Sequence, residues 1–185
     1  MDARVRYTQN IIKRVMFELL EKIEIEKITV TEICKLAQVN RATFYKYFDN
    51  PYDLLNKMEQ DFLDRLELKL KSSDSNDLSY VFTCVLTDIK ENYQYYKILF
   101  SENGDDKFKE RLFNICYRTN IETINELFKN LDEKKKRWLY FFIAEGCNGV
   151  LSQWLNDGMS ESISYVVDFL QSIIYGINKS CERIV

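Results

Sequence analysis

Apolar residues recur at intervals of three and four along nearly the whole of this chain, and that spacing places them on one face of an α-helix. The first such set is Ile12, Val15, Met16, Leu19, Leu20 and Ile23. Only one proline and five glycines stand among the 185 residues, so positions that favour tight turns are scarce. The pattern predicts an all-α chain of about nine helices, with no convincing strand and no internal repeat.

The apolar spacing also gives approximate bounds for these helices. We expect them at about 5–26, 30–37, 41–47, 51–71, 78–92, 95–100 and 107–130, followed by two long helices that begin after Asp132 and after Ser160. Polar breaks are expected at 72–77 and at 102–105. The helix that begins after Asp132 is expected to end at Gly158, with Gly158 itself in the left-handed conformation.

Three helix starts carry specific capping signals. Thr29 precedes Glu32 by three positions, which is the spacing of a capping box. Asn40 is a suitable N-cap for the short helix at 41–47. Asn50-Pro51 combines an N-cap with a proline at the first helical position, where its missing N–H costs nothing.

Composition excludes several functional classes. The chain has no histidine, which removes Ser-His-Asp and Cys-His nucleophile pairs and nearly all catalytic zinc sites. No glycine-rich phosphate loop is present either. The cysteines, odd in number and without a C-x-x-C pair, are Cys34, Cys84, Cys116, Cys147 and Cys181. We expect reduced thiols, with redox sensing as the less favoured alternative, and neither enzyme activity, a metal nor a cofactor.

No window reaches the roughly 18 apolar residues of a membrane span, and the N-terminus has no apolar signal core. We therefore expect a soluble, cytoplasmic protein with no membrane partner. The net charge of −3 is unevenly spread. Residues 1–50 hold 9 Lys/Arg and 7 Asp/Glu, a net of +2, whereas the rest holds 17 and 22, a net of −5. A mildly basic head thus precedes an acidic body.

The head contains two short helices around a tight corner, in the stretch TVTEICKLAQVNRATFYKYF at 29–48. Helices this short are marginal alone and must be held by packing. An inward face is provided by Ile28, Ile33, Ala37, Val39, Phe44 and Phe48. The corner at 38–40 sets the second helix across the first, as in a helix-turn-helix whose second helix lies in the DNA major groove.

The outward face suits DNA. Arg41 can bridge to a guanine edge or a phosphate, and the methyl groups of Ala42 and Thr43 can meet a thymine methyl. Hydroxyl and ammonium groups on Tyr45, Lys46 and Tyr47 can bind phosphates. The start of the helix at 30–37 offers free N–H groups beside two threonine hydroxyls. The alternative is an ordinary three-helix packing unit with a solvated polar face.

These residues carry a resemblance to a known family. The stretch TVTEICKLAQVNRATFYKYFDNPYDLL at 29–55 closely resembles the DNA-binding segment of the TetR family of bacterial transcriptional regulators. The resemblance implies a homodimer on a palindromic operator in double-stranded DNA. It implies DNA contacts from Thr29, Thr31, Arg41, Ala42, Thr43, Tyr45, Lys46 and Tyr47.

Three positions depart from the family pattern. Gln38 stands where glycine is usual, so it is expected to adopt a positive φ at a cost of roughly 1 kcal/mol relative to glycine. Tyr47 stands where histidine is frequent. Pro51 replaces a common basic residue, so one phosphate contact is lost and Lys57 or Lys46 is expected to substitute for it in part.

The acidic body carries a second resemblance. The stretches GCNGVLSQWLNDGM at 146–159 and YKILFSENG at 96–104 resemble a TetR subgroup that includes regulators related to dihydroxyacetone-kinase control. The strongly apolar last two helices predict a four-helix dimer interface. Its expected residues are Trp138, Gly146, Val150, Trp154, Val166, Leu170, Ile173 and Ile177. The alternative is that all of these residues are internal core.

Aromatic residues in the body predict an effector pocket with apolar walls and hydroxyl tips. The expected lining is Tyr93, Tyr96, Phe100, Phe113, Tyr117 and Phe142, and plain core packing is the alternative at each position.

Taken with the resemblance, the sequence predicts a DNA-binding domain at 1–50 and a helical effector-binding and dimerisation domain at 51–185. The hypothesis is a homodimeric repressor released from its operator by an unidentified small-molecule effector. The alternative is a DNA-binding regulator controlled by a protein partner that binds the C-terminal domain. A purely structural helical protein would leave the face at 41–47 unexplained.

Overall fold

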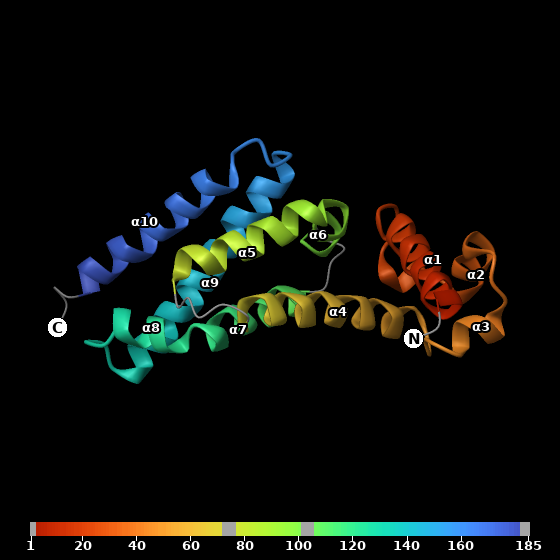
Figure 1. Ribbon diagram of the computed structural model, residues 1–185, viewed down its shortest axis with the longest axis horizontal. Helices are drawn as coiled ribbons and strands as arrows, with labels where there is room; N and C mark the ends of the chain where they lie inside the picture. Colours follow the sequence, from red (N-terminus) through yellow and green to blue (C-terminus); the bar gives the residue numbers. More distant parts are fainter. Residues whose placement is uncertain (1–2, 72–76, 101–105, 182–185) are drawn as a thin grey trace. The chain divides into compact units, whose positions relative to one another are not determined.

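The computed structural model describes residues 3–71, 77–100 and 106–181, and within these ranges the chain is built from ten α-helices and one 3-10 helix (Figure 1). No strand occurs in the described residues, so the all-α prediction is confirmed. The expected polar breaks at 72–77 and 102–105 fall, except for Asp77, outside the described residues.

The chain divides into two compact units. The first unit is Met1–Phe62 with Ile98–Asp105, and the second is Leu63–Lys97 with Asp106–Val185. Helix α4 (Pro51–Lys71) contributes its first half to the first unit and its last residues to the second. No helix in the described ranges is both long enough and apolar enough to cross a membrane.

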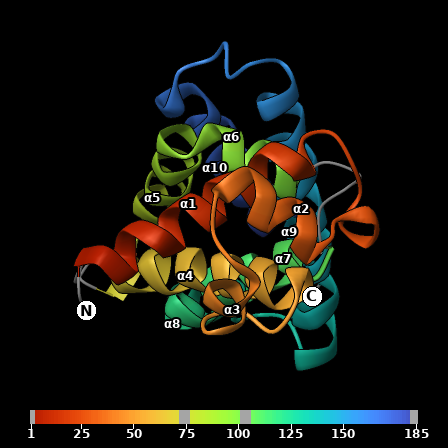
Figure 2. The same cartoon turned by 90° about the vertical axis from the view of Figure 1, so that its right-hand side faces the viewer.

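The first unit packs α1 (Ala3–Leu20), a 3-10 turn (Ile25–Lys27), α2 (Val30–Ala37) and α3 (Arg41–Tyr45) with the start of α4. In Figure 2, α2 lies against α1 and α3 against α2. The largest fully buried side chains of this unit are Ile12, Met16, Leu20, Ile33, Phe44, Leu54 and Met58. α1 ends at Leu20, six residues before the predicted end, because the chain turns there and brings Ile28 into the core.

The predicted caps of this unit are present. The Thr29 hydroxyl accepts from the Glu32 N–H at 3.2 Å, and the Glu32 carboxylate accepts from the Thr29 N–H at 3.2 Å, which completes the capping box. The Asn40 side chain accepts from the Thr43 N–H at 2.7 Å and so begins α3. Gln38 has φ 54° and ψ 41°, the left-handed conformation predicted for it.

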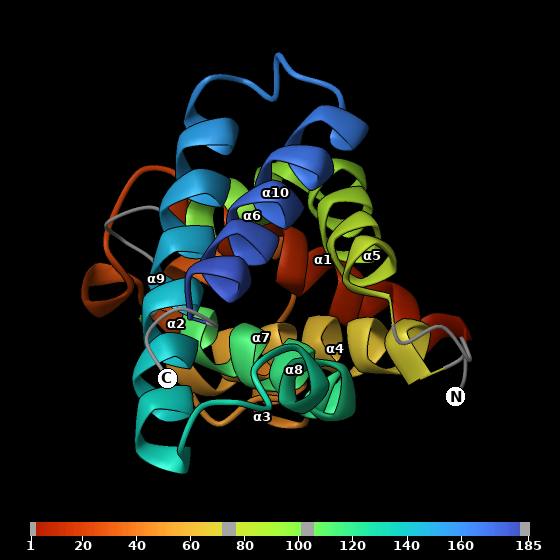
Figure 3. The ribbon, with the colours of Figure 1, turned by 90° about the vertical axis from the view of Figure 1, so that its left-hand side faces the viewer.

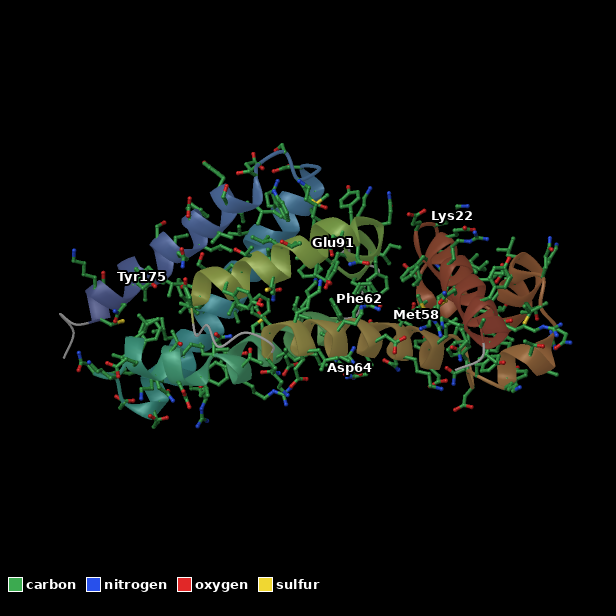
Figure 4. The ribbon with its side chains drawn as sticks, viewed as in Figure 1. Lys22, Met58, Phe62, Asp64, Glu91 and Tyr175 are labelled. Atoms are coloured by element: carbon green, nitrogen blue, oxygen red, sulfur yellow. The ribbon has the colours of Figure 1, made fainter. Side chains whose placement is uncertain are left out.

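α4 begins at the predicted residue and is amphipathic, with one buried and one exposed face. The Asn50 side chain accepts from the Asp53 N–H at 2.9 Å, and Pro51 occupies the first helical position. Figure 4 shows Met58 and Phe62 on one side of the helix and Asp64 on the other. The first two side chains are buried and Asp64 is exposed, as expected for an amphipathic helix.

The second unit contains α5 (Leu78–Glu91), most of α6 (Tyr93–Leu99), α7 (Asp106–Thr119), α8 (Ile121–Leu127), α9 (Glu133–Asn156) and α10 (Ile163–Cys181). α10 packs along α5 (Figure 3). One part of the core joins α5, α10 and the segment between α8 and α9 through Leu78, Ile174, Phe128 and Leu131.

Two helix boundaries in this unit correct the sequence prediction. The single helix expected at 107–130 is broken at Asn120, whose buried side chain donates to the Cys116 carbonyl at 3.0 Å. Thr119 likewise donates to the Ile115 carbonyl at 2.9 Å, so side chains bind carbonyls near the end of α7. The last helix begins after Ser162, not Ser160, because the Ser162 hydroxyl accepts from the Tyr165 N–H at 3.2 Å.

Other features of the unit follow the prediction. Asp132 caps α9 by accepting from the Lys135 N–H at 2.9 Å. Gly158 has φ +73°, the left-handed conformation expected after α9, and Met159 follows it with φ 57°. All five cysteines are free thiols.

A buried carboxylate ties α4, α5 and α6 together. Asp88 on α5 is almost fully buried and accepts from the Tyr96 hydroxyl at 2.7 Å and from Lys69 Nζ at 3.1 Å. Hydrogen bonding to Asp88 raises the pKa of Lys69. The pKa of Tyr96 is also raised, first by burial and then by the Asp88 charge. The network therefore favours the protonated forms of Lys69 and Tyr96.

Candidate nucleic-acid interface

The corner between α2 and α3 is held by backbone hydrogen bonds and by one aromatic anchor. The N–H groups of Gln38 and Val39 both donate to the Cys34 carbonyl, the latter at 3.0 Å. Phe44 is fully buried, and its ring centroid lies 5.7 Å from that of Phe48. A five-residue helix thus keeps a fixed orientation although it has too few turns to be stable alone.

The structure brings the eight predicted DNA-contact residues together on α2, α3 and the turn after α3. Thr29, Thr31, Arg41, Ala42, Tyr45 and Lys46 are exposed, whereas Thr43 and Tyr47 are partly buried. Tyr45 retains 54 % of its surface, although its ring contacts the buried Phe44 edge-on. An exposed aromatic side chain on a polar helix face is suited to contact a partner through both its ring and its hydroxyl.

Arg41 and Thr31 are linked across the corner. The Arg41 guanidinium donates a hydrogen bond to the Thr31 hydroxyl, which connects the first residue of α3 to the first turn of α2. This contact orients the guanidinium and leaves its other N–H groups for an acceptor such as a phosphate or a guanine edge.

Lysines surround the end of α3 in two different ways. Lys46 is exposed and lies over the Tyr47 ring, with Nζ 5.6 Å from the centroid. Lys57 on α4 donates to the Tyr47 carbonyl at 3.0 Å and to Asp53 at 2.8 Å. The hydrogen bond from Lys57 lowers the pKa of Asp53. Lys57 is therefore bound within the unit, and Lys46 is the better placed of the two for a phosphate.

Cys34 lies inside this unit and has no role on the outward face. Burial raises the pKa of its thiol, with Arg41 acting in the opposite direction. The thiol is thus protonated and unreactive near neutral pH.

The predicted dimer-interface residues occupy different environments. Trp138, Gly146 and Ile173 are exposed, and Val150 and Ile177 are partly buried. The other three, Trp154, Val166 and Leu170, are buried within the second unit, where the Trp154 indole donates to the Glu161 carbonyl at 3.2 Å. Further exposed aromatic residues lie on the same two helices: Phe142 on α9, and Tyr165 and Phe169 on α10.

The second unit contains a partly open apolar cavity of about 100 Å³ between α5, α7, α8, α9 and α10. Of the predicted pocket residues, Phe113 and Tyr117 line it, but Tyr93, Tyr96, Phe100 and Phe142 do not. Tyr96 is bound to Asp88, Phe100 belongs to the first unit, and Phe142 points outward with 67 % of its surface exposed.

Most of the cavity wall comes from residues that the sequence reasoning missed. Aliphatic side chains from α5 and α9 supply much of it, together with Tyr140, Cys116 and Cys147. Burial raises the pKa of both thiols to about 12, so they act as apolar wall groups. The missed signal was the inward stripe of α9, Leu139, Ile143, Cys147 and Leu151, which recurs at helical spacing.

The described chain is all-α, and its first unit holds two helices around a tight corner with an outward basic and hydroxyl-rich face. These features define a helix-turn-helix transcriptional regulator. Residues 76–176 match the family model TetR_C_8, the C-terminal region of transcriptional regulators. The chain belongs to the TetR family of transcriptional regulators.

Individual relatives agree with this assignment. The chain is 30 % identical over 114 residues to the HTH-type dhaKLM operon transcriptional activator DhaS of Lactococcus lactis, and the match covers 54 % of this chain and 59 % of the relative. A TetR regulator from Streptococcus agalactiae has the same fold, with TM-score 0.72, 20 % identity and coverage of 94 % and 96 % of the two chains. The fatty acid degradation regulator FadR of Bacillus halodurans matches with TM-score 0.71, 16 % identity and coverage of 91 % and 95 %.

Proposed function

We propose that this transcriptional regulator acts as a homodimer that binds a palindromic operator through α3 and the start of α2. The observation that carries the proposal is the outward face of the corner. Arg41, Tyr45 and Lys46 are exposed there while Phe44 anchors the same short helix in the core. Guanidinium, phenol and ammonium groups on one face match phosphates and base edges of a major groove.

The proposed dimer uses exposed apolar residues of α9 and α10. We define the aromatic face as Trp138, Phe142, Gly146, Tyr165, Phe169 and Ile173, all of which are exposed. Large apolar side chains exposed at the surface favour association. A Cβ atom on Gly146 would meet no atom within 4 Å, so a second helix can approach closely there. A two-fold pairing would present two α3 helices to a two-fold symmetric operator.

Regulation is proposed to start at the apolar cavity of the second unit. A small molecule that enters it would release the protein from the operator, which makes the protein a repressor. The effector must bind the DNA-incompetent state more tightly than the DNA-binding state, since otherwise it shifts no population.

A protein partner that engages the second unit is the second candidate. The cavity of about 100 Å³ is smaller than the roughly 300–1,000 Å³ of most small-molecule sites, which favours a partner or a very small effector. The Lactococcus relative is named an activator, so activation is the alternative sign of regulation.

DNA binding is tested by fluorescence anisotropy with duplexes from the region upstream of the gene. We expect tight binding to one duplex. We also expect the affinity to fall steeply as the salt concentration rises, because lysine and arginine side chains that bind phosphates displace counterions from the DNA. The variant Arg41→Ala with Tyr45→Ala should lose binding and remain dimeric. Lys22→Ala is the control, since this exposed charge lies just beyond the end of α1 (Figure 4). Unchanged binding by the double variant would contradict the assignment of the interface.

The two modes of regulation give different results. A small effector should raise the melting temperature of the isolated protein and dissociate the operator complex. A protein partner should instead co-purify with the full chain and change operator binding in a reconstituted mixture.

A further inference from the structure

The apolar cavity has a polar neighbour. A pocket of about 440 Å³ lies between α7 and α9, and Phe113, Tyr140 and Ala144 line both it and the apolar cavity. These three residues form the boundary between the two spaces. A molecule that passes this boundary would touch the apolar cavity with one end and the polar pocket with the other.

The polar pocket is rich in hydrogen-bond acceptors. Glu110 and Glu145 each contribute an exposed carboxylate to its wall, and Asn114 contributes an amide. Lys109 is the only cation among the lining residues, all of which lie in the part of the chain that the structure describes. Two carboxylates against one ammonium disfavour an anionic group in this pocket.

One acceptor in the wall lacks a donor. Among the described residues, the buried side-chain oxygen of Asn148 has no hydrogen-bond partner. A buried acceptor without a donor is costly, so a ligand group that donates to it gains affinity.

A hydroxyl group at the boundary adds a second acceptor. Tyr140 donates its hydroxyl hydrogen to the Asn114 side chain at 3.2 Å, which leaves the oxygen lone pairs able to accept. Burial raises the pKa of Tyr140 to about 12, so this hydroxyl stays protonated near neutral pH. Tyr140 and Asn148 therefore offer acceptors to a ligand on the polar side of the boundary.

We propose that the two spaces form one site for a small amphiphile, with a short alkyl end in the apolar cavity and an uncharged, hydroxyl-bearing head in the polar pocket. This inference rests on the proposed effector function and names the class of effector. The head donates to Asn148 and Tyr140, in a pocket whose wall also holds the carboxylates of Glu110 and Glu145. Since a 150 Å³ cavity holds benzene, a cavity of about 100 Å³ limits the alkyl end to about four carbons.

The site also lies beside the aromatic face. Phe141 and Glu145 line the polar pocket and are next to Phe142 and Gly146 on α9. A bound head group would thus change the surroundings of helix residues that neighbour the proposed dimer contact.

The test uses isothermal titration calorimetry on the full chain with three compounds. 1,2-Hexanediol has a four-carbon end and a diol head, hexanoate has a chain of the same length with an anionic head, and n-butane has four carbons and no polar head. We expect 1,2-hexanediol to bind at least tenfold more tightly than hexanoate. We expect n-butane to bind as well, because it needs only the apolar cavity.

Two substitutions distinguish binding of the polar head group from binding of the alkyl end. Asn148→Ala and Tyr140→Phe should each weaken the binding of 1,2-hexanediol about tenfold, the effect of losing one buried hydrogen bond, and Asn148→Ala should leave the binding of n-butane unchanged. Asn125→Ala, an exposed asparagine on α8, is the matched control and should change neither. Circular dichroism and operator binding report whether each variant is folded.

Equal binding of 1,2-hexanediol and hexanoate, or no effect of either substitution, would overturn the proposed head site. Binding of n-butane would then still support the apolar cavity as an effector site. If none of the three compounds binds, both the amphiphile site and the small-molecule mode of regulation are contradicted. The DNA interface is tested separately, by the anisotropy experiment.

Discussion

The guanidinium of Arg41 donates a hydrogen bond to the hydroxyl of Thr31, and so one polar contact spans the two helices that are proposed to meet DNA. Both side chains are exposed, so the contact adds little to stability. Its effect is on orientation, because it restricts the rotamers of a long side chain before any acceptor arrives.

Replacing Thr31 by valine removes the acceptor and keeps the branched shape. We expect operator affinity to fall about threefold to tenfold, since Arg41 is then no longer oriented before it binds, while the free energy of unfolding changes by less than about 0.5 kcal/mol. Fluorescence anisotropy and urea denaturation measure the two quantities. Thr83→Val, at an exposed threonine of α5, should leave operator affinity unchanged.

Gln38 is in the left-handed conformation with φ 54°. A residue with a Cβ is strained there, so Gln38→Gly should increase the free energy of unfolding by about 1 kcal/mol. Gln38→Ala keeps the Cβ and should give no increase. Urea denaturation of the three proteins decides the matter, and a destabilised glycine variant would argue against backbone strain at this corner.

Asn40 caps α3, a helix of only five residues, with its side chain. Asn40→Ala should lower the free energy of unfolding by about 1 kcal/mol, and Asn40→Asp, which keeps the acceptor, should lower it much less. The alanine variant should also bind the operator more weakly, because α3 is then less well ordered. If Asn40→Ala and Asn40→Asp have the same free energy of unfolding, the side-chain cap does not stabilise α3.

The buried contact between Asp88 and Tyr96 predicts a pH dependence. The pKa of Tyr96 is raised in the folded protein, so above about pH 10 unfolding releases a proton that the folded state retains. Stability from this group is therefore complete below about pH 10 and is lost as the pH rises. Near pH 8, Tyr96→Phe should be less stable than the wild type by about 1–2 kcal/mol.

The difference between the two proteins should shrink between about pH 10 and 11, as followed by thermal unfolding. A constant difference across this range would show that the Tyr96 hydroxyl does not titrate differently in the folded and unfolded states.

The aromatic face predicts a change of oligomeric state. Phe142→Asp should convert the protein to a monomer in sedimentation velocity and weaken operator binding at least tenfold, because a charge is then buried against apolar side chains. Leu68→Asp is the matched control, since Leu68 is an exposed apolar residue of α4 outside that face. If the Phe142→Asp variant remains a dimer, the dimer interface does not include the aromatic face.

Local signals in the sequence proved sufficient for most of the fold. The capping pairs at Thr29, Asn40 and Asp132 depend only on residues within one turn, and each forms as predicted. The break at Asn120 could not be seen in the same way, because its apolar neighbours continue the helical spacing. It follows from the burial of its amide, which is decided by packing between helices.

The DNA interface and the apolar cavity also differ in how far a local sequence signal can predict them. Each proposed DNA contact lies within about twenty residues of the others along the chain, so a sequence motif can name it. The apolar cavity instead draws on five helices far apart in sequence, and only Phe113 and Tyr117 of its predicted residues line it. Aromatic character indicated a buried environment but not which side of a helix faces the cavity.

The contact between Lys57 and the Tyr47 carbonyl has a mechanical consequence for regulation. Because Lys57 belongs to α4 and also binds Asp53 on the same helix, the exit of α3 is fastened to the beginning of α4. A tilt of those first turns would carry α3 and its proposed DNA contacts with it. Under the proposed function, an effector signal would then need only a displacement of α4, with no flexible joint between α3 and α4.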